Sequence, residues 1–489
     1  MNLIVASNRL PFAVSRGENG EWQIAPGNGG LVTALRPVLR NRGGRWIGWA
    51  GVTDDELADP GSLFVDSRRR FGYELIPVPL TARDKESFYA GFSNEIVWPL
   101  FHDLLSLCNF DPAYWAGYEA VNQKFAAAAA AHAGPDDFLW VHDYHLMRMA
   151  SALRGIGFQG RAAFFLHIPF PPLDLFLRMP WRFEVLQSLL AYDLVGFQTV
   201  RDRRNFVQCV RLLAKDVRIS GRGAVWTMRV DGRDVRVGSF PISIDAAEFE
   251  RRAEEPEVVE KAALIRSREP ARRIVLGIDR LDYTKGIPQK LEAFRLLLHR
   301  APDLRGRVTL VQVVVPSRED LPMYQDYKVK VERLVGEING EFTRDGWVPV
   351  HYLYRGLDGP RLPAYYLAAD VALVTPLKDG MNLVAKEYCA TRIDEDGVLI
   401  LSEFAGAAAQ LQRGALLVNP FDVEGVANAL ETALEMPRAE RGARMRKLRR
   451  AVHDDDIYRW LDTFLEAAIS RELEDFPLVD DYLPAAASQ

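Results

Sequence analysis

Two charged loops carry residue types that would bind a diphosphate. Arg280 and Lys285 lie five residues apart in the run GIDRLDYTKG, after an apolar segment that the pattern predicts to be a buried strand, and Gly286 precedes a predicted helix. Loops at the carboxyl ends of strands bind ligands in open α/β sheets. Two cations at such a place would neutralise the charge of a departing phosphate. The ordinary alternative, a solvated loop with a surface ion pair, contributes little, and a second loop of the same kind argues against it.

The second loop, KDGMNLVAKEY, starts at Lys378 and follows an apolar run at 370–376 that is typical of a buried strand. Asp379 supplies a carboxylate, and Glu387 lies about one turn into the predicted helix, close enough to reach a ribose. An acid at a helix start is otherwise a simple dipole partner. The backbone N–H groups at this helix start, which would bind an anion or a hydroxyl, belong to Gly380, Met381, Asn382 and Leu383.

The first half of the chain offers a glycine loop and a basic strand end. Gly29 and Gly30 precede an apolar helix predicted at 31–39, and such a loop can close over a phosphate through its backbone N–H groups. A simple turn is an equal alternative for this loop taken alone. Arg9 follows the first predicted strand, at 3–7, so it would point toward the ligand-binding edge.

Composition sets bounds on the function. The 489 residues exceed one core and predict two domains. A hydrophobic content of 48% and a charged content of 26% are ordinary for a globular protein, and the net charge of −5 argues against nucleic acid binding. There is no apolar run of membrane-spanning length and no basic leader before the first strand. Three cysteines without CxxC spacing favour reduced thiols and a cytoplasmic protein.

Strands and helices alternate along the chain, which predicts parallel sheets flanked by helices. The expected fold class is α/β, with two Rossmann-like parallel-sheet domains facing a central cleft. We place the domains at 1–243, 244–455 and a C-terminal helical segment at 456–489, with the hinge near 240–245. The expected buried strands lie at 3–7, 138–142, 163–167, 194–197, 274–277, 308–315, 350–354, 371–375 and 398–401, and helices are expected at 125–133 and in the tail at 454–476.

Ten ordered segments together resemble the trehalose-6-phosphate synthases, a family of retaining glucosyltransferases with the two-domain glycosyltransferase B fold. The resemblance covers nearly the whole chain, and ten segments in order are far more specific than one motif. The segments are SNRLP, GGLVTAL, WIGWAG, FSNEIVWPLFH, WVHDYHL, FFLHIPFP, DLVGFQT, GIDRLDYTKG, PSRED and KDGMNLVAKEY.

The resemblance implies a role for individual residues. The acceptor, glucose 6-phosphate, would be held by Arg9, Tyr89, Trp98 and Arg318, with both arginines and the phenol on its phosphate. Asp143 would bind acceptor hydroxyls and His167 would contact the transferred sugar. Arg280 and Lys285 would stabilise the departing diphosphate, so the expected catalytic residues are Arg280, Lys285, Asp143 and His167. The tail helix would cross back onto the first domain. For an isolated Tyr or Trp, core packing is the more ordinary role.

No carboxylate lies in a motif suited to attack on an anomeric carbon, so a covalent intermediate is not supported. The resemblance implies transfer with retention on a single face of the sugar. The leaving diphosphate would accept the proton of the incoming hydroxyl. Asp394 and Asp396 spell an Asp-x-Asp pattern that binds manganese in other glycosyltransferases, but a solvated acidic loop is favoured here. His142 and His145 lack a ligand set at metal spacing. We predict no metal and no cofactor.

Several alternatives stay open. A related transferase that uses another phosphorylated acceptor, such as a glucosylglycerol-phosphate synthase, would share most of these motifs, as would a catalytically silent sugar-phosphate sensor. UDP-glucose is the donor that the family implies, while GDP and ADP donors fit the same motifs. The partners expected are the nucleotide sugar and glucose 6-phosphate, with no nucleic acid and no membrane, and homo-oligomerisation stays open.

Overall fold

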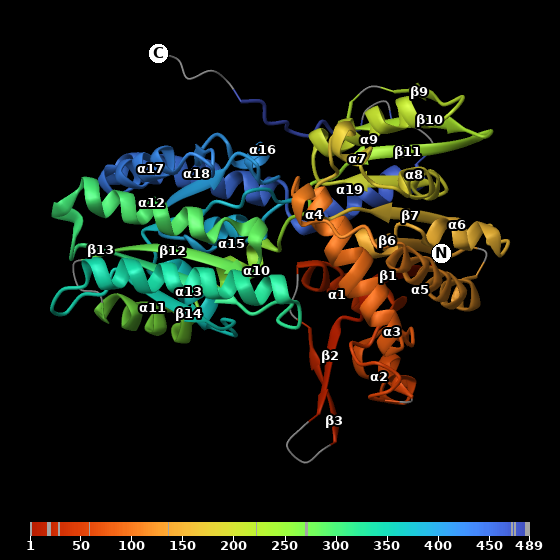
Figure 1. Cartoon of the computed structure of the whole chain (residues 1–489), viewed down its shortest axis with the longest axis horizontal. Coiled ribbons are helices and arrows are strands. Elements are labelled where there is room, and N and C mark those ends of the chain that lie inside the picture. The colour runs from red at the N-terminus through yellow and green to blue at the C-terminus, as the bar shows by residue number, and fades with distance from the viewer. Residues whose placement is uncertain are drawn as a thin grey trace. The chain divides into compact units, whose positions relative to one another are not determined.

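The computed structural model describes residues 2–16, 21–27, 30–57, 59–134, 136–221, 223–268, 272–470, 473 and 476–484. The chain forms two compact units (Figure 1). The first contains Met1–Pro241 and Leu461–Val479, and the second contains Ile242–Trp460 and Asp480–Gln489. The α/β class and the two parallel-sheet domains expected from the sequence are confirmed.

The first unit is built on a sheet of nine described strands, of which seven run parallel and the last two antiparallel. In spatial order they are β5 (Glu74–Pro77), β4 (Arg45–Trp49), β1 (Leu3–Arg9), β6 (Phe138–His142), β7 (Arg161–Phe165), β8 (Leu194–Phe197), β11 (Arg233–Ser239), β10 (Val225–Val230) and β9 (Arg218–Ser220). Two further strands, β2 (Phe12–Arg16) and β3 (Trp22–Pro26), form a separate antiparallel ribbon that projects from this unit (Figure 1).

Helices connect these strands. Strand β6, with the sequence FLWVH, is buried at every residue, which is why it forms a central strand. The helices are α1 (Gly30–Arg42), α2 (Ser67–Phe71), α3 (Ala82–Asp84), α4 (Trp98–Phe101), α5 (Pro112–His132), α6 (Met149–Gly155), α7 (Leu173–Phe176), α8 (Arg182–Leu189), α9 (Val200–Leu213) and α19 (Ile457–Ile469), with a π-helix η2 (Lys85–Val97) and the 3-10 turns η1 (Pro60–Phe64), η3 (Leu105–Leu107) and η4 (Tyr144–Leu146).

The second unit has an all-parallel sheet of six described strands. In spatial order they are β14 (Val350–Tyr354), β13 (Val308–Val315), β12 (Arg273–Arg280), β15 (Val371–Val374), β16 (Val398–Ser402) and β17 (Leu416–Val418). The helices are α10 (Ala246–Ala253), α11 (Pro256–Arg268), α12 (Ile287–Arg300), α13 (Pro322–Phe342), α14 (Arg361–Ala368), α15 (Leu383–Thr391), α16 (Ala408–Leu411), α17 (Val423–Glu435) and α18 (Arg438–Asp454), with the 3-10 turns η5 (Tyr283–Lys285) and η6 (Pro302–Leu304).

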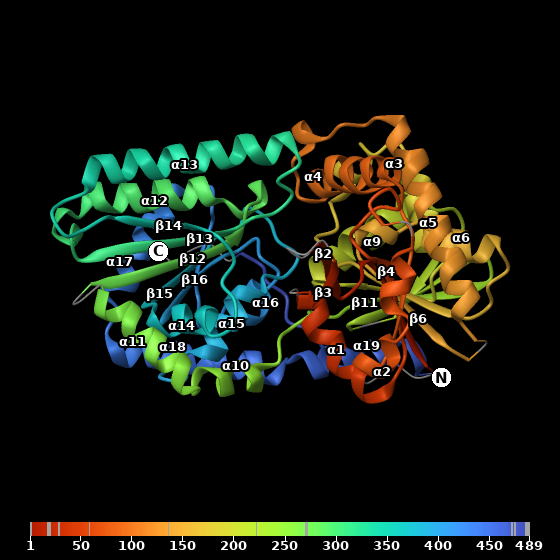
Figure 2. The ribbon, with the colours of Figure 1, turned by 90° about the horizontal axis from the view of Figure 1, so that it is seen from below.

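The helices of the second unit cover both faces of its sheet. Figure 2 shows α12 and α13 on one side and α14 on the other. Helix α12 presents Ile287, Leu291, Phe294 and Leu298, all fully buried, at the spacing that places apolar side chains on one helix face. They join the core that the sheet forms with α13 and α17. This packing fixes the start of α12, directly after the first charged loop.

Most of the strands expected from the sequence are confirmed, but several bounds differ, and the helix expected at 125–133 is the end of the longer α5. Strand β12 runs on to Arg280, because it pairs with β13 up to the Arg280–Val315 register. Strand β7 ends at Phe165, two residues before His167, because its pairing with β6 already begins at Arg161. The tail helix expected at 454–476 is shorter: it is α19 at Ile457–Ile469, because α18 ends at Asp454 and the backbone leaves helical geometry at Asp455.

Helix α19 packs on the first unit through an aromatic side chain. Phe464 of α19 stacks on Trp140 of β6 at 4.3 Å between ring centroids, and it also lies 5.1 Å from Phe240, so this helix packs on the sheet of the first unit. The three cysteines are free, and burial raises the pKa of each thiol to about 12. Within the described residues, no helix combines the length and the apolar character needed to cross a membrane.

Candidate functional site

The first charged loop of the second unit begins at the carboxyl end of β12. Arg280 is the last residue of that strand and is exposed, while Lys285 ends η5 and is 8% exposed. Both residues therefore lie at the carboxyl end of β12, where Lys285 is largely buried. Gly286 then has φ 64°, and an added Cβ would lie 2.7 Å from the carbonyl oxygen of Thr375, so glycine is required where the chain turns into α12.

Lys285 joins the two charged loops. Its Nζ donates to Oδ2 of Asp379 at 2.6 Å, and Nδ2 of Asn382 donates to the same oxygen at 3.1 Å. Both members of the ion pair are largely buried, with 10% and 16% of the side chain exposed. A buried pair of this kind is held in one geometry, because breaking it would leave an uncompensated charge. The two charged loops therefore meet in the folded chain.

A second carboxylate, Asp282, lies beneath the cations. It is fully buried, and its Oδ1 accepts hydrogen bonds from the backbone N–H and the hydroxyl of Thr284, at 3.0 and 2.9 Å. Burial by itself would raise the pKa of Asp282, but the charges of Arg318, Arg280 and Lys285 outweigh it, and the net direction is downward. The carboxylate therefore stays ionised and draws the three cations together.

Arg318 belongs to this cluster. Its Nη1 lies 3.4 Å from Oδ2 of Asp282, it also donates to the hydroxyl of Tyr324, and its side chain is only 6% exposed. Its backbone is left-handed, with φ 52°, which costs free energy in a residue other than glycine. A left-handed backbone at a residue other than glycine is typical of functional positions.

A cluster of buried polar side chains supports the carboxyl end of β12. Lys290 Nζ donates to Oδ2 of Asp279 at 2.6 Å, and Gln312 Nε2 donates to the same oxygen at 2.9 Å. The two charged side chains are 0% and 2% exposed. At Gly277 an added Cβ would lie 2.3 Å from Oε1 of Gln312. This packing fixes the residue immediately before Arg280.

The second charged loop is held by close backbone contacts. Asn382 caps α15, because its Oδ1 accepts from the N–H of Ala385 at 3.1 Å. The N–H of Ala407 donates to the carbonyl of Met381 at 2.8 Å. A Cβ on Gly406 would come within van der Waals overlap of the carbonyl oxygen of Gly380, at 1.9 Å. The expected helix start after Gly380 is thus confirmed, and Gly406 is a supporting residue that the sequence analysis missed.

Replacing Gly406 with alanine is expected to displace the Gly380–Asn382 loop. Because the colliding atom is a backbone oxygen that cannot rotate away, we expect a loss of about 1–3 kcal/mol in unfolding free energy and weaker nucleotide binding. Urea unfolding and nucleotide titration would measure the two effects. Gly336→Ala in α13, where an added Cβ meets nothing within 4 Å, is the matched control. It should leave nucleotide binding unchanged and, as a replacement inside a helix, raise the stability by up to ~1 kcal/mol.

Glu387 lies on α15 one turn beyond the loop. Its Oε2 accepts a hydrogen bond from the hydroxyl of Tyr366 at 2.7 Å. Burial raises the pKa of the Glu387 carboxyl, against the opposing effects of Tyr366 and of the charge of Arg252. The carboxyl is therefore oriented by a phenol and is suited to a hydrogen bond with a hydroxyl of a ligand.

In the first unit, Arg9 ends β1 and lies among aromatic rings. Its guanidinium carbon is 4.1 Å from the ring centroid of Trp49 and 5.7 Å from that of Tyr89. At Gly51 an added Cβ would lie 2.2 Å from Nη1 of Arg9, so only glycine leaves room for this arginine. Tyr89 stacks in turn on His145 at 6.0 Å. The structure thus brings two of the expected acceptor residues together.

The next expected residues of the first unit are Trp98 and the glycine pair Gly29 and Gly30. Trp98 is only 4% exposed and packs 4.3 Å from the His102 ring, so in this structure it lies in the core. Gly29 lies outside the described residues, and Gly30 is the first residue of α1.

Asp143 and His167 lie together at the carboxyl ends of β6 and β7. Oδ1 of Asp143 accepts a hydrogen bond from the N–H of His167 at 3.2 Å, and the backbone of Asp143 has φ 74°. Nε2 of His167 lies 3.1 Å from Nδ1 of His142, and its Nδ1 lies 3.5 Å from Nε2 of Gln198.

Burial keeps both histidine rings neutral. Burial lowers the pKa of His167 to about 3 and, with the neighbouring ring, lowers that of His142. His167 is therefore a neutral contact residue in this structure and lacks the basicity of a general base.

The lowered histidine pKa values predict acid sensitivity. The unfolded chain binds protons at these residues below about pH 6.5, whereas the folded chain does not until about pH 3 for His167. Stability is therefore complete above pH 6.5 and falls as the pH decreases toward 3, by up to ~1.4 kcal/mol per pH unit for each histidine. Urea unfolding between pH 7.5 and 5 would measure the slope. His142→Asn should reduce it, and an unchanged slope would contradict this origin.

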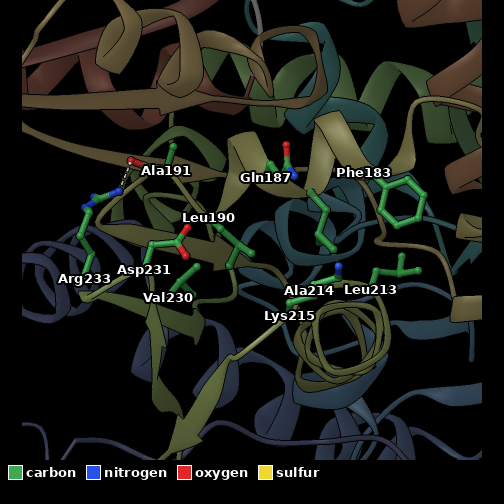
Figure 3. Close-up of a pocket in the computed structure, with 11 residues that line it drawn as sticks. Phe183, Gln187, Leu190, Ala191, Leu213, Ala214, Lys215, Val230, Asp231 and Arg233 are labelled. Atoms are coloured by element: carbon green, nitrogen blue, oxygen red, sulfur yellow. Dashed lines mark hydrogen bonds between the residues drawn. The ribbon is translucent and has the colours of Figure 1, made fainter.

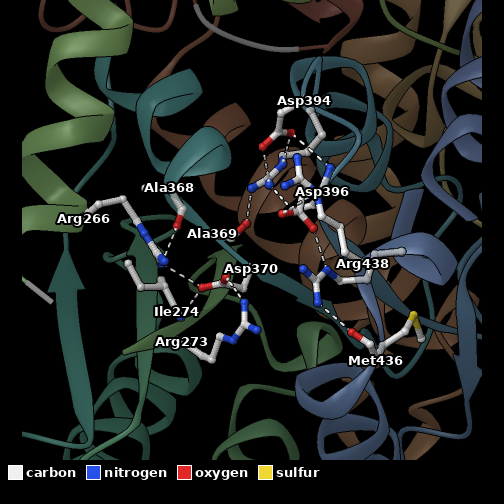
Figure 4. Close-up of polar contacts among 12 residues, drawn as sticks. Arg266, Arg273, Ile274, Ala368, Ala369, Asp370, Asp394, Asp396, Met436 and Arg438 are labelled. Carbon is white, nitrogen blue, oxygen red and sulfur yellow. Dashed lines mark hydrogen bonds and ion pairs between the residues drawn. The ribbon is translucent and has the colours of Figure 1, made fainter. Parts of the chain in front are cut away.

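The Asp-x-Asp run is an arginine-paired loop. Asp394 contacts Arg392 at 2.7 Å, Glu395 contacts Arg446 at 2.8 Å, and Asp396 contacts Arg441 at 2.6 Å. Figure 4 shows Asp394 and Asp396 with their basic partners, beside the separate cluster of Asp370 with Arg266 and Arg273. Among the described residues, no group of three or more histidine, cysteine or acidic residues is arranged to hold a metal ion.

A pocket of about 720 Å³ lies elsewhere in the first unit (Figure 3). It is bordered by α8, the end of α9 and the turn between β10 and β11, near the amino ends of β8 and β11. The expected site residues lie instead at the carboxyl ends of strands, and none of them lines this pocket.

Together, the two parallel-sheet units with polar residues at their strand ends have the architecture of the glycosyltransferase B fold. The model of glycosyltransferase family 20 matches residues 1–470. The chain belongs to that family.

Its relatives include a trehalose-6-phosphate synthase of Mycolicibacterium gilvum, 45% identical over 478 residues that cover 96% of this chain and 94% of the relative. Among solved structures, an α,α-trehalose-phosphate synthase (UDP-forming) of Burkholderia xenovorans, in complex with glucose-6-phosphate, has a TM-score of 0.85 and 35% identity, covering 96% of this chain and 100% of that one. An E. coli structure bound with UDP-2-fluoro glucose has the same TM-score, identity and coverage.

Proposed function

We propose that this protein transfers glucose from UDP-glucose to glucose 6-phosphate, giving α,α-trehalose 6-phosphate and UDP. The observation that carries the proposal is the cation cluster at the end of β12, where Arg280, Lys285 and Arg318 surround the ionised Asp282. Membership of glycosyltransferase family 20 supports it, as do relatives that are trehalose-6-phosphate synthases and solved structures holding glucose-6-phosphate and a UDP-glucose analogue.

In this proposal the second unit holds the donor. Arg280 and Lys285 neutralise the diphosphate as negative charge develops on it, which is electrostatic stabilisation of the transition state. Asp379 and the loop from Gly380 to Leu383, which includes Met381 and Asn382, bind hydroxyls of the glucose, and Glu387 binds the ribose. The hydrogen bonds that hold Asp379 and Asn382 orient these groups before the donor arrives.

The first unit holds the acceptor. Arg9 and Tyr89 bind the phosphate with a guanidinium and a phenol, and Trp98 and Arg318 are the further acceptor residues of this proposal. Asp143 binds acceptor hydroxyls, and His167 contacts the transferred sugar. Gly29, which lies outside the described residues, and Gly30 are proposed as further donor-binding residues.

We propose that transfer proceeds with retention and without a metal. The bond between the anomeric carbon and the diphosphate oxygen breaks, and a bond forms on the same face to the anomeric hydroxyl oxygen of glucose 6-phosphate. The proton of that hydroxyl passes to the leaving diphosphate, so no protein base is required. The low pKa of His167 supports this assignment of the proton.

The experiment is nucleotide release from UDP-glucose in EDTA-treated buffer, with and without glucose 6-phosphate. We expect release only with the acceptor, and a product that phosphatase converts to α,α-trehalose. Release that needs added Mg²⁺ or Mn²⁺ would contradict metal independence, and a β linkage would contradict retention. Nucleotide release with glycerol 3-phosphate as the acceptor would favour a transferase of the glucosylglycerol-phosphate synthase kind. Binding of UDP-, GDP- or ADP-glucose without nucleotide release would favour a catalytically silent sugar-phosphate sensor.

A further inference from the structure

A buried lysine of α15 lies beside the donor residues and has no role in the proposed reaction. Lys386 is 1% exposed. Its Nζ donates to the carbonyl oxygen of Ile242 at 2.9 Å and to Oε1 of Gln410 at 2.7 Å. The three residues are far apart in the sequence, so this amino group joins three segments of the second unit.

The surroundings of Lys386 favour a structural amine rather than an ion pair. Both of its acceptors are neutral, and the nearest carboxylate in the network, Asp455, is reached through Gln410, whose Nε2 donates to Oδ2 of Asp455 at 2.8 Å. Burial lowers the pKa of Lys386 to about 7, against the opposing charge of Asp455. The neutral amine still has two N–H groups, enough for both acceptors. The contacts therefore persist in either protonation state.

The partners of Lys386 lie where the chain passes between the two units. Ile242 is the first residue of the second unit, and Asp455 is the C-cap of α18, shortly before the chain leaves that unit after Trp460. The segment that begins at Ile242 and the segment that follows Asp455 also contact each other, because the N–H of Ile457 donates to the carbonyl of Ile244 at 3.0 Å. Lys386 thus connects α15 to both of them.

The other connections of α15 lead to the donor residues. Glu387 is the next residue along the helix, and Asn382, which caps the helix, donates to the carboxylate of Asp379. A shift of α15 would therefore move the ribose and hexose contacts together. A misplacement of about 1 Å far from the reacting atoms can cost up to ~100-fold in rate.

We propose that Lys386 is a positioning residue for the donor, fixing α15 to two of the segments through which the chain passes between its units. The inference rests on the proposed function, since it takes Glu387 and the Asp379–Asn382 loop as donor contacts. Lys386 acts through these residues and does not touch the substrate itself. Loss of its two hydrogen bonds allows α15 to move, which weakens donor binding before it affects the acceptor.

The test is Lys386→Met, which keeps an unbranched side chain but removes both N–H donors. We expect the KM for UDP-glucose and the Kd for UDP to rise about tenfold, while the KM for glucose 6-phosphate changes less than twofold. Leu430→Ala in α17 is the stability control: Leu430 is fully buried in the core of the same unit and outside the donor site. It should lower the Tm by a similar amount and leave both KM values unchanged.

A second variant keeps the proposal falsifiable if Lys386→Met does not fold. Gln410→Met removes the acceptor of Lys386 and the donor to Asp455, and it should raise the donor KM several-fold without affecting the acceptor KM. In an active wild-type enzyme, an unchanged donor KM in both variants, or an equal rise of both KM values, would overturn the inference. A wild-type protein that releases no nucleotide would instead contradict the proposed function.

Discussion

Replacement of Arg280 by alanine is expected to lower kcat by about 10²–10³-fold while leaving stability within ~0.5 kcal/mol of wild type. Arg280 is the exposed last residue of β12, so its removal opens no cavity. Its charge matters most when the diphosphate leaves, and Lys285, already bound to Asp379 at 2.6 Å, supplies only part of the compensation. Turnover measured at saturating substrates, together with urea unfolding, would separate the two effects.

The same strand supplies the matched control for Arg280. Arg273 is the first residue of β12 and pairs with Asp370 at 2.9 Å, at the opposite end of the strand from the charged loops. Arg273→Ala should cost some stability and leave kcat unchanged. Equal turnover in Arg280→Ala and wild type would remove Arg280 from the diphosphate site, and an equal loss in both variants would show a general effect of arginine removal on this strand.

Much of the fold could be predicted because the central strands are continuous apolar runs. The expected strands at 138–142, 194–197, 308–315 and 350–354 coincide with β6, β8, β13 and β14. Strands buried on both faces by helices need such runs. The ribbon of β2 and β3 was missed, because a pair of strands outside the main sheet lacks this signal.

The site was harder to predict, because its geometry depends on contacts between distant segments. Local motifs named Lys285 and Asp379, but the bond between them spans 94 residues and is visible only in the folded chain. Asp282 was missed as the centre of the cluster, although an aspartate two residues before a threonine in a turn is a recognisable signal for such a cap. No local pattern distinguishes the buried Lys386 from a lysine on a helix surface.

Arg9→Ala is expected to raise the KM for glucose 6-phosphate by about 10- to 100-fold and to raise the KM for unphosphorylated glucose much less. A charge-assisted hydrogen bond contributes about 1.5–3 kcal/mol, and Arg9 is preorganised by Trp49 and by the space that Gly51 leaves. Initial rates with both acceptors would measure the preference. Arg16→Ala, which removes another arginine stacked on a tryptophan, 4.9 Å from the ring centroid of Trp22, is the control and should change neither KM. An unchanged preference in Arg9→Ala would place the acceptor phosphate elsewhere, because no hydroxyl of glucose replaces the charge that this guanidinium would bind.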